Sequence, residues 1–337
     1  MRLTGKLSVL RISLVFASAF ALALLPGFAA EPTAPLVYYF PNVAGLGTLE
    51  TVLPIKSLVG LDRLSSNKRK LADAVGTVKL PRLKEQLVYF RPGNALIRKP
   101  QLLDDISPEN ICHFRFNFTS ACDAEDSIPD NLVSRISHLK NLMTIGLNNC
   151  DVTDTGVKGI HDMPKLQSVD LGHSLVTAKS LPVFSKLSGL RSLALDGLDM
   201  SGGDFNQIAR LPKLSLLRLH GTQVRDSQIA ALKVAKGLTV LDLSANPGIT
   251  DASLVTVAAL PELNYLDVSN TSVSVPALKK FPKINRIIVA ERDLKGVSLK
   301  QMQKVIKNID LNADLVQNSK VIKPGADELH LFAPTHF

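Results

Sequence analysis

The sequence contains no tryptophan and few aromatic residues or cysteines. Aromatic residues make up 5% of the 337 residues, whereas hydrophobic residues as a whole make up 45%. A buried core must therefore be mainly aliphatic. The three cysteines, Cys112, Cys122 and Cys150, are odd in number, which excludes a disulfide framework that pairs them all. The fold must depend on packing instead.

Common catalytic signatures are also missing. The chain has no G-x-S-x-G, no H-E-x-x-H and no phosphate-binding loop, which would indicate a nucleophile, a zinc site or a nucleotide site. Cys112, His113 and Cys122 offer three metal ligands without a fourth, and a Cys112–Cys122 disulfide or free thiols fit these residues as well. We therefore expect no enzymatic activity, no metal and no cofactor.

The first residues have the layout of a secretory signal peptide. Three positive charges are followed by residues 12–25, which are uncharged and mostly apolar, and then by Pro26 and Gly27. Cleavage after Ala29 would place small residues, Gly27 and Ala29, three residues and one residue before the cut, where signal peptidase substrates carry them. We expect residues 1–29 to be removed and the mature protein to be exported, to the periplasm, the cell envelope or the medium. The alternative is an uncleaved membrane anchor formed by 7–30, although fourteen apolar residues fall short of the roughly 20 needed to span a bilayer.

Positive charge is concentrated near the N-terminus of the mature chain. Residues 56–100 hold eleven Lys or Arg against three acids, whereas residues 101–337 hold equal numbers of each. This stretch suits contact with an anionic surface, or it is simply a solvated face. An exported protein makes nucleic acid the least suitable partner.

A repeated aliphatic phrase occupies the centre of the chain. The unit reads L-x-x-L-x-L, then two variable residues, a small polar residue, any residue and an aliphatic. Its first four steps are 24 residues long and the last is 25. Periods of this length indicate a solenoid, and the alternation indicates a strand with one buried face. The strand positions are Leu142, Ile145 and Leu147; Leu166, Val169 and Leu171; Leu190, Leu193 and Leu195; Leu214, Leu217 and Leu219; Leu238, Leu241 and Leu243; and Leu263, Leu266 and Val268.

The second half of each unit changes to a helical period. Apolar residues recur at a spacing of three, as in Phe205, Ile208 and Leu211. Aspartates such as Asp154 and Asp226 stand at the expected helix starts, where they favour capping, and prolines stand at the ends. The small polar residue before each helix is expected to turn inward and satisfy buried loop groups.

These residues resemble the leucine-rich-repeat family. The phrase L-x-x-L-x-L-x-x-[NCT]-x-[VI]-T-D in 142–154 is similar to the 24-residue, Cys/Thr-tolerant repeats of exported bacterial proteins and of F-box proteins. The resemblance implies a ribonuclease-inhibitor-like α/β solenoid, with a curved parallel sheet on the concave side and short helices on the convex side. It covers 139–294 well, and more weakly reaches Ile111 and Val316.

The domain organisation follows from this core. We expect an N-terminal cap or small basic region over 30–110, the solenoid over 111–316 and a C-terminal cap or tail over 317–337, because an open stack needs its ends covered. Strands are expected at 77–80 and 86–91, with a basic helix at 68–74.

The resemblance implies recognition through the concave face. Strand neighbours of the buried leucines should line it, at about 5 Å from strand to strand. Asp242 and Asp267 share a register, and Ile288 interrupts the row before Asp310. The candidate ligand-binding residues are Asp170, His173, Asp196, Arg218, His220, Asp242, Tyr265 and Asp267.

We therefore interpret the chain as a non-enzymatic protein that binds a protein or cell-surface ligand. One rival is an envelope-associated structural protein attached to an anionic surface through 56–100. Weaker rivals are an F-box-like adaptor and an enzyme with unrecognised chemistry in 31–110. The sequence does not indicate the ligand or the oligomeric state.

Overall fold

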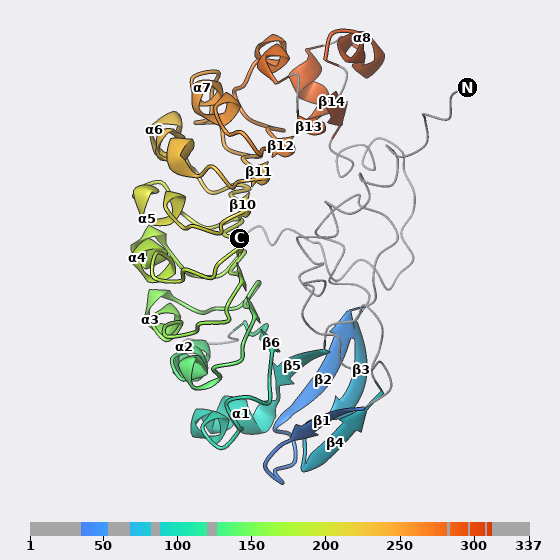
Figure 1. The fold of residues 1–337 in the computed structure, drawn as a ribbon, viewed down its shortest axis with the longest axis vertical. Coiled ribbons are helices and arrows are strands. Elements are labelled where there is room, and N and C mark those ends of the chain that lie inside the picture. The colour runs from blue at the N-terminus through green and yellow to red at the C-terminus, as the bar shows by residue number, and fades with distance from the viewer. Residues whose placement is uncertain are drawn as a thin grey trace, which may run out of the picture.

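The fold is a curved arc of stacked coils (Figure 1). The computed structural model describes residues 35–52, 68–81, 88–119, 127–281, 284–295, 297–306 and 309–311. Strands line the inner, concave edge of the arc and short helices line the outer edge. The predicted signal peptide 1–29 and the predicted tail 317–337 lie outside the described residues. No helix in the described part of the chain is long and apolar enough to cross a bilayer.

The strands are β1 Leu36–Tyr39, β2 Gly47–Val52, β3 Lys68–Asp73, β4 Thr77–Leu80, β5 Val88–Pro92, β6 His113–Arg115, β7 Thr144–Gly146, β8 Ser168–Asp170, β9 Ser192–Ala194, β10 Leu216–Arg218, β11 Val240–Asp242, β12 Tyr265–Asp267, β13 Arg286–Val289 and β14 Ile309–Leu311. The α-helices are α1 Asn94–Arg98, α2 Ser127–Val133, α3 Asp154–Val157, α4 Leu181–Phe184, α5 Asn206–Ala209, α6 Asp226–Ile229, α7 Ser253–Ala258 and α8 Leu299–Gln303. The 3₁₀ turns are η3 Pro100–Leu103, η5 Ile136–His138, η6 Ala178–Ser180, η7 Ala230–Val234, η8 Val275–Lys280 and η9 Glu291–Leu294.

One sheet of twelve strands runs along the concave side of the described chain. Its order is β14-β13-β12-β11-β10-β9-β8-β7-β6-β5-β2-β3, and neighbours from β5 to β14 are parallel. Leu217 pairs with Leu193 on one side and with Leu241 on the other, so residues 24 apart in sequence are neighbours in the sheet. This register confirms the predicted leucine-rich-repeat solenoid.

The core is a continuous aliphatic column between the sheet and the helices. The strand leucines Leu193, Leu217 and Leu241 are completely buried. The weaker ends of the predicted repeat pack in the same way, since Phe114 and Ile309 are also buried. Burying one such side chain stabilises the fold by roughly 1.5–3 kcal/mol. A coil gains this stabilisation only when a neighbouring coil covers its apolar face, so the repeats must stack.

The turn after each strand needs a left-handed residue at one fixed position. Asn149, His173, Gly197, Gly221, Ala245 and Asn270 occupy it, with φ of 53°, 55°, 71°, 60°, 56° and 58°. Only two of the six are glycine, although glycine adopts this conformation at the lowest cost. The stacked ladder on both sides holds the other four in place.

Inward-facing polar residues complete the turn, as predicted. Asn246 is fully buried, donates to the carbonyl oxygens of Leu219, Leu243 and Ser244, and accepts from the N–H of Thr222. One side chain therefore bonds to backbone groups of two adjacent coils. The carbonyls of Leu219 and Ser244 also accept from the hydroxyl of Thr222 and the N–H of Gly221, so the Leu243 carbonyl and the Thr222 N–H depend most on Asn246.

The aspartates at the helix starts bond differently from the prediction. We expected Asp154 to cap its own helix, but Thr153 caps α3 and the Asp154 carboxylate accepts from the N–H and hydroxyl of Thr177 in the next coil. Its position over the neighbouring turn explains this, because that turn brings two donors within 2.9 Å and 2.6 Å.

The N-terminal region extends the same sheet. Strands β2 and β3 pair antiparallel and β2 also pairs antiparallel with β5, while β1 and β4 form a separate two-stranded sheet. The strand predicted at 77–80 is confirmed as β4, and the one at 86–91 is confirmed over the described residues as β5. The helix predicted at 68–74 is wrong, because this segment forms β3. Pairing with β2 overrides the helical preference of the Lys, Arg, Leu and Ala residues of β3. Lysines are common on edge strands, and β3 is the edge strand of this sheet. The limits of the cap, solenoid and tail stay predictions.

Candidate functional site

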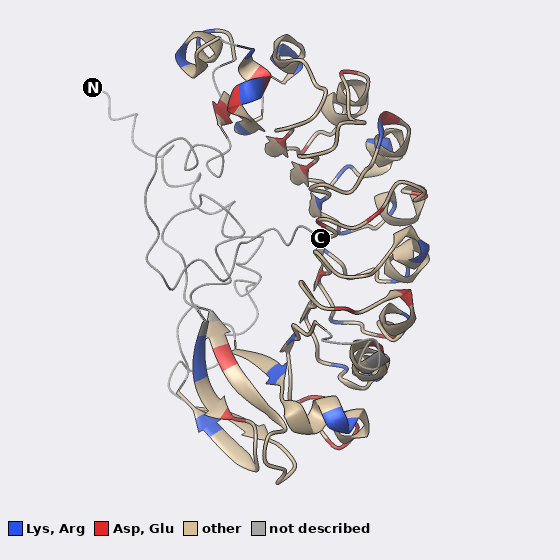
Figure 2. Cartoon of the chain, turned by 180° about the vertical axis from the view of Figure 1, so that it is seen from behind, with Lys and Arg blue, Asp and Glu red and all other residues tan. Residues whose placement is uncertain are grey.

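The candidate site is the concave face, where strand neighbours of the buried leucines form rows across the sheet. One row runs through Arg115, Gly146, Asp170, Ala194, Arg218, Asp242, Asp267, Ile288 and Asp310. A second row lies two residues further along each coil and contains Asp196, His220, Ser244 and Ser269. The backbone hydrogen bonds between coils continue past the strand ends and keep these residues side by side. Figure 2 shows acidic segments at successive strands toward the C-terminal half of this edge.

An ion pair stands near the middle of the concave face. The Arg218 guanidinium lies 2.5 Å from the Asp196 carboxylate, and their side chains are 19% and 5% exposed. Burial raises the pKa of Asp196 to about 7, and the attraction of Arg218 offsets only part of this effect. The sequence placed both residues on this face but did not predict that they pair across adjacent coils.

Asp242 and Asp267 are directly paired across strands β11 and β12. The Oδ1 atom of Asp242 accepts from the N–H and hydroxyl of Ser244, and that of Asp267 accepts in the same way from Ser269. Burial, followed by the nearby Asp242 charge, raises the pKa of Asp267 to about 7. The fold therefore holds two adjacent carboxylates together although their charges repel.

His220 connects these two groups. The backbone N–H of His220 donates to Asp196 Oδ1 at 3.3 Å, and its ring atom Nδ1 lies 2.8 Å from the Ser244 hydroxyl oxygen. Together with the Asp242–Ser244 bonds, this forms a continuous polar network over three coils. Tyr265 lies one row away, paired with Val240 and Arg286, and burial raises its pKa.

His173 is placed differently from the prediction. It was expected as a strand neighbour, but β8 ends at Asp170 and His173 occupies the left-handed turn position, where its side chain is exposed. A Cβ atom at Gly197 would lie 2.4 Å from its ring nitrogen Nδ1, so the ring lies against the equivalent turn of the next coil. His173 is therefore at the rim of the sheet.

The N-terminal end of the concave face is basic. Arg115 lies beside Gly146, whose missing side chain leaves space for the aliphatic stem of Arg115. Among the buried side-chain nitrogen and oxygen atoms of the described residues, Arg115 Nε is one of two that have no hydrogen-bond partner. The ring of the adjacent His113 packs at 5.4 Å from Tyr89, and burial lowers the pKa of His113 to about 4.

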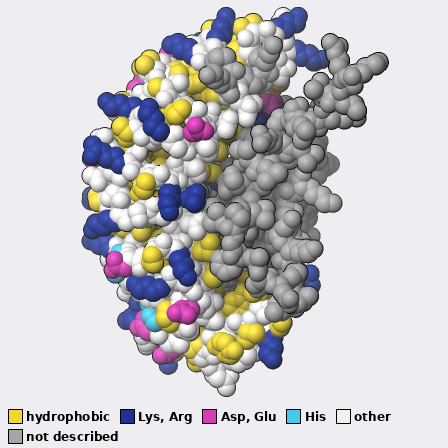
Figure 3. Space-filling view, in the orientation of Figure 1, with side chains coloured by type: hydrophobic (Ala, Val, Ile, Leu, Met, Phe, Trp, Pro, Cys, Tyr) yellow, Lys and Arg dark blue, Asp and Glu magenta, His cyan; other side chains and the backbone are white. Residues whose placement is uncertain are grey.

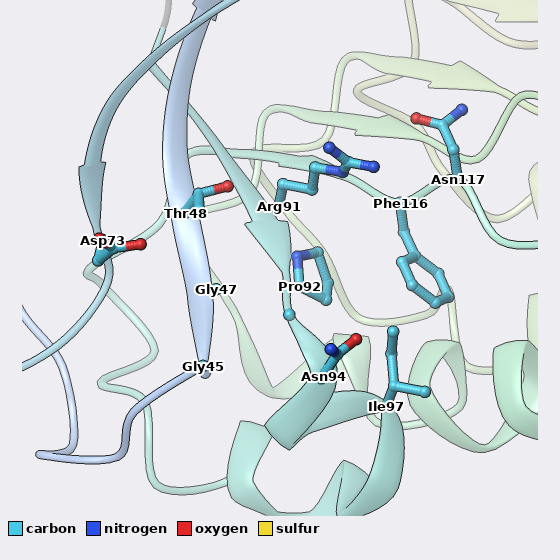
Figure 4. A pocket seen from close by; sticks show the side chains of 11 residues that line it. Gly45, Gly47, Thr48, Asp73, Arg91, Pro92, Asn94, Ile97, Phe116 and Asn117 are labelled. Atoms are coloured by element: carbon cyan, nitrogen blue, oxygen red, sulfur yellow. The ribbon is translucent and has the colours of Figure 1, made fainter.

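A small cavity of about 330 Å³ opens beside this basic end (Figure 4). Pro92, Ile97 and Phe116 form its apolar wall, while Arg91 and Asn117 supply polar groups. Arg91 is also paired with Glu50 at 3.5 Å. The sequence did not predict this cavity, because its walls come from β2, β3, β5, α1 and the residues that follow β6, which only the fold brings together.

The cysteines and the metal hypothesis are partly outside the described residues. Cys112 is exposed and Cys150 is buried, and burial raises the pKa of Cys150 to about 12. Cys122 is not among the described residues, so neither a metal site nor a disulfide with Cys112 is tested. Among the residues that are described, no three His, Cys, Asp or Glu side chains are grouped to hold a metal ion.

Comparisons with known proteins find leucine-rich-repeat proteins. No family model matches the chain. Receptor-like protein 6 of Arabidopsis thaliana is 27% identical over 130 residues, which are 39% of this chain and 13% of that protein. The chain therefore spans only a small part of that relative.

Solved structures give similarities of the same kind. Internalin C2 of Listeria monocytogenes matches with 16% identity and a TM-score of 0.41 over 65% of this chain and 92% of that one. Internalin F of the same organism matches with 15% identity and a TM-score of 0.40, over 64% of this chain and 72% of that one. A chain of the mouse RP105/MD-1 complex matches with 14% identity and a TM-score of 0.41, over 63% of this chain and 39% of that one. Residues 139–294 are leucine-rich repeats by their own register, and the identities are too low to assign a ligand.

Proposed function

We propose that this chain is a non-enzymatic recognition protein that binds a protein ligand through the concave sheet. The observation that supports this most directly is the register pairing of Asp242 with Asp267. Two adjacent carboxylates repel each other, and burial adds to the cost of ionising them. The equivalent position of β9 is Ala194, so the coil geometry does not require an acid there.

The charge of this site indicates the kind of ligand. Asp170, Asp242 and Asp267 lie in one row, and Arg218, which separates the first from the other two, is already paired with Asp196. A basic or polar segment of a protein partner would relieve the repulsion between Asp242 and Asp267. Electrostatic complementarity of this kind favours fast association and fixes the register of the partner.

The test is affinity capture with matched charge variants. Wild-type protein and the double variant Asp242→Asn, Asp267→Asn are immobilised, and the captured proteins are identified by mass spectrometry. We expect proteins that bind the wild type at low salt to be lost or strongly reduced on the variant. The control is Asp199→Asn with Asp204→Asn, which removes two exposed carboxylates from the strand-to-helix loop 195–205, outside the concave sheet. Equal capture by all three proteins contradicts the proposal.

The proposed function includes export. The layout of residues 1–29 supports it, and an exported protein would meet its ligand outside the cytoplasm. Mass spectrometry of the mature N-terminus tests this directly, with Ala30 as the expected first residue. An intact Met1 would contradict cleavage and leave a membrane anchor formed by 7–30 as the alternative.

A further inference from the structure

Charge is divided between the two flanks of the solenoid. Every helix runs in the same sense, so all loops from helix to strand lie on one flank and all loops from strand to helix lie on the other. We call the first the basic flank and define it by the loops 139–143, 158–167, 185–191, 210–215, 235–239 and 259–264. It carries eight bases and two acids, namely Lys140, Lys158, Lys165, Lys186, Arg191, Arg210, Lys213 and Lys236 with Asp162 and Glu262.

The opposite flank has the reverse balance. Its loops are 147–153, 171–177, 195–205, 219–225, 243–252 and 268–274, and apart from Asp196, which lies on the concave face, they hold four aspartates and one arginine, Arg225. The stretch 101–337 is neutral as a whole, so its linear composition conceals this separation. The tertiary structure sorts balanced charges onto two faces.

The separation has the direction that the helix dipole favours. Cations are favourable near helix C-termini and anions near N-termini. In a single helix this preference affects one or two residues, but parallel stacking repeats it on the same side in every coil. Lys236 illustrates it, since it donates to the carbonyl oxygen of Ala259, the C-cap residue of α7 in the next coil. Lys140 donates to the carbonyl oxygen of Asp162, in the loop after α3.

The basic flank is broad and accessible. All of its bases except Arg191 are exposed. Figure 3 looks down the shortest axis of the molecule onto this flank and shows Lys and Arg side chains spread from one end of the arc to the other, with few acids between them. The charges do not converge on one point, as they would around a small anion.

We propose that the basic flank docks on an anionic lipid bilayer. A planar, negatively charged surface can meet single cations spread over a broad face, and each Lys or Arg near such a surface adds attraction within about a Debye length. This orientation would leave the concave face open at the side, free for its ligand. The inference goes beyond the proposed function and does not depend on it.

The test measures partition of the full chain onto vesicles. Phosphatidylcholine vesicles with and without phosphatidylglycerol are sedimented with wild-type protein and with Lys186→Glu, Lys213→Glu. We expect the wild type to bind the anionic vesicles in a salt-sensitive way and the variant to bind about tenfold or more weakly. Residues 1–30 are the same in every protein, so phosphatidylcholine vesicles alone measure any apolar insertion.

The matched control reverses two exposed bases elsewhere, Lys179→Glu with Arg225→Glu, both near helix starts. We expect this control to bind within about twofold of wild type, because its changed side chains lie away from the bilayer.

Equal loss in both variants, or no loss in either, would overturn the proposal. Binding of soluble dextran sulfate without binding of anionic vesicles would overturn the assignment to a bilayer. The variant Asp242→Asn, Asp267→Asn should keep its vesicle binding, which separates this test from that of the concave site.

Discussion

The Asp226 carboxylate accepts hydrogen bonds from both the N–H and the hydroxyl of Thr250, which is 24 residues further along the chain, at 2.9 Å and 2.6 Å. It also accepts from the hydroxyl of Ser253. The pairs Asp130–Thr153, Asp154–Thr177 and Asp251–Ser274 repeat the arrangement. These four bridges join the starts of α2, α3, α6 and α7 to the next coil, on the side of the stack opposite the basic flank.

Removing one bridge should weaken the stack. Asp226→Ala leaves the N–H of Thr250 and two hydroxyl groups without their acceptor, so we expect a loss of about 2–3 kcal/mol in the free energy of unfolding. Urea unfolding measures it. Asp204→Ala is the matched control, because the Asp204 carboxylate bonds only to Asn206 and Gln207 in its own coil, and it should lose at most about 1 kcal/mol. Equal losses would show that the inter-coil bonds add nothing.

Asn246 should be the most sensitive polar position of the turns. Asn246→Ala would leave three buried carbonyl groups and the N–H of Thr222 short of a partner, so we expect a loss of about 3–5 kcal/mol or failure to fold. Cys150→Ala changes the equivalent residue of another coil and should cost about 1 kcal/mol, since Cys150 acts mainly as a small buried hydrophobe. The comparison uses urea unfolding, or soluble yield if Asn246→Ala does not fold. A mild effect at Asn246 would contradict its role.

The Arg218–Asp196 pair predicts a pH-dependent mutant effect. Arg218→Ala leaves the buried Asp196 carboxylate without its counter-charge, which should cost about 2–4 kcal/mol at pH 8. At pH 5 the cost should be smaller, because Asp196 has a raised pKa and becomes neutral by binding a proton. The double variant Arg218→Ala, Asp196→Asn should recover much of the loss at pH 8. If the double variant is no more stable than Arg218→Ala, the charge is not the cause.

Asp267 predicts how the stability of the wild type depends on pH. Its folded-state pKa of about 7 lies above the ordinary value of 3.8, so between these values the folded state binds more protons than the unfolded state. Stability should therefore fall as pH rises from about 4 to about 7, by up to about 1.4 kcal/mol per pH unit from this group, and stay level above it. Asp196 has a similarly raised pKa and adds to the same decline, so Asp267→Asn should reduce the slope without abolishing it, measured by urea unfolding at pH 5, 6 and 7. A profile of unchanged slope would contradict the raised pKa.

The core and the turns could be predicted because they depend on residues that repeat locally. Leu193, Leu217 and Leu241 recur every 24 residues, and one coil buries them only against the next, so their spacing predicts both the strands and the stacking. The same alternation placed Asp196, Arg218, Asp242 and Asp267 on the concave face. It did not predict the Arg218–Asp196 pair, because side-chain directions across neighbouring coils depend on the curvature of the sheet.

The sequence alone therefore determined the solenoid, its period and, with the exception of His173, which of the candidate side chains lie on the concave face. The tertiary structure decided three further points, each of which depends on contacts between distant segments. Pairing with β2 made 68–73 a strand where local preference favoured a helix. Stacking turned Asp154 and Asp226 from expected caps into bridges between coils. The parallel direction of all the helices separated a neutral stretch of charges into an acidic and a basic flank, which no local window of sequence reveals.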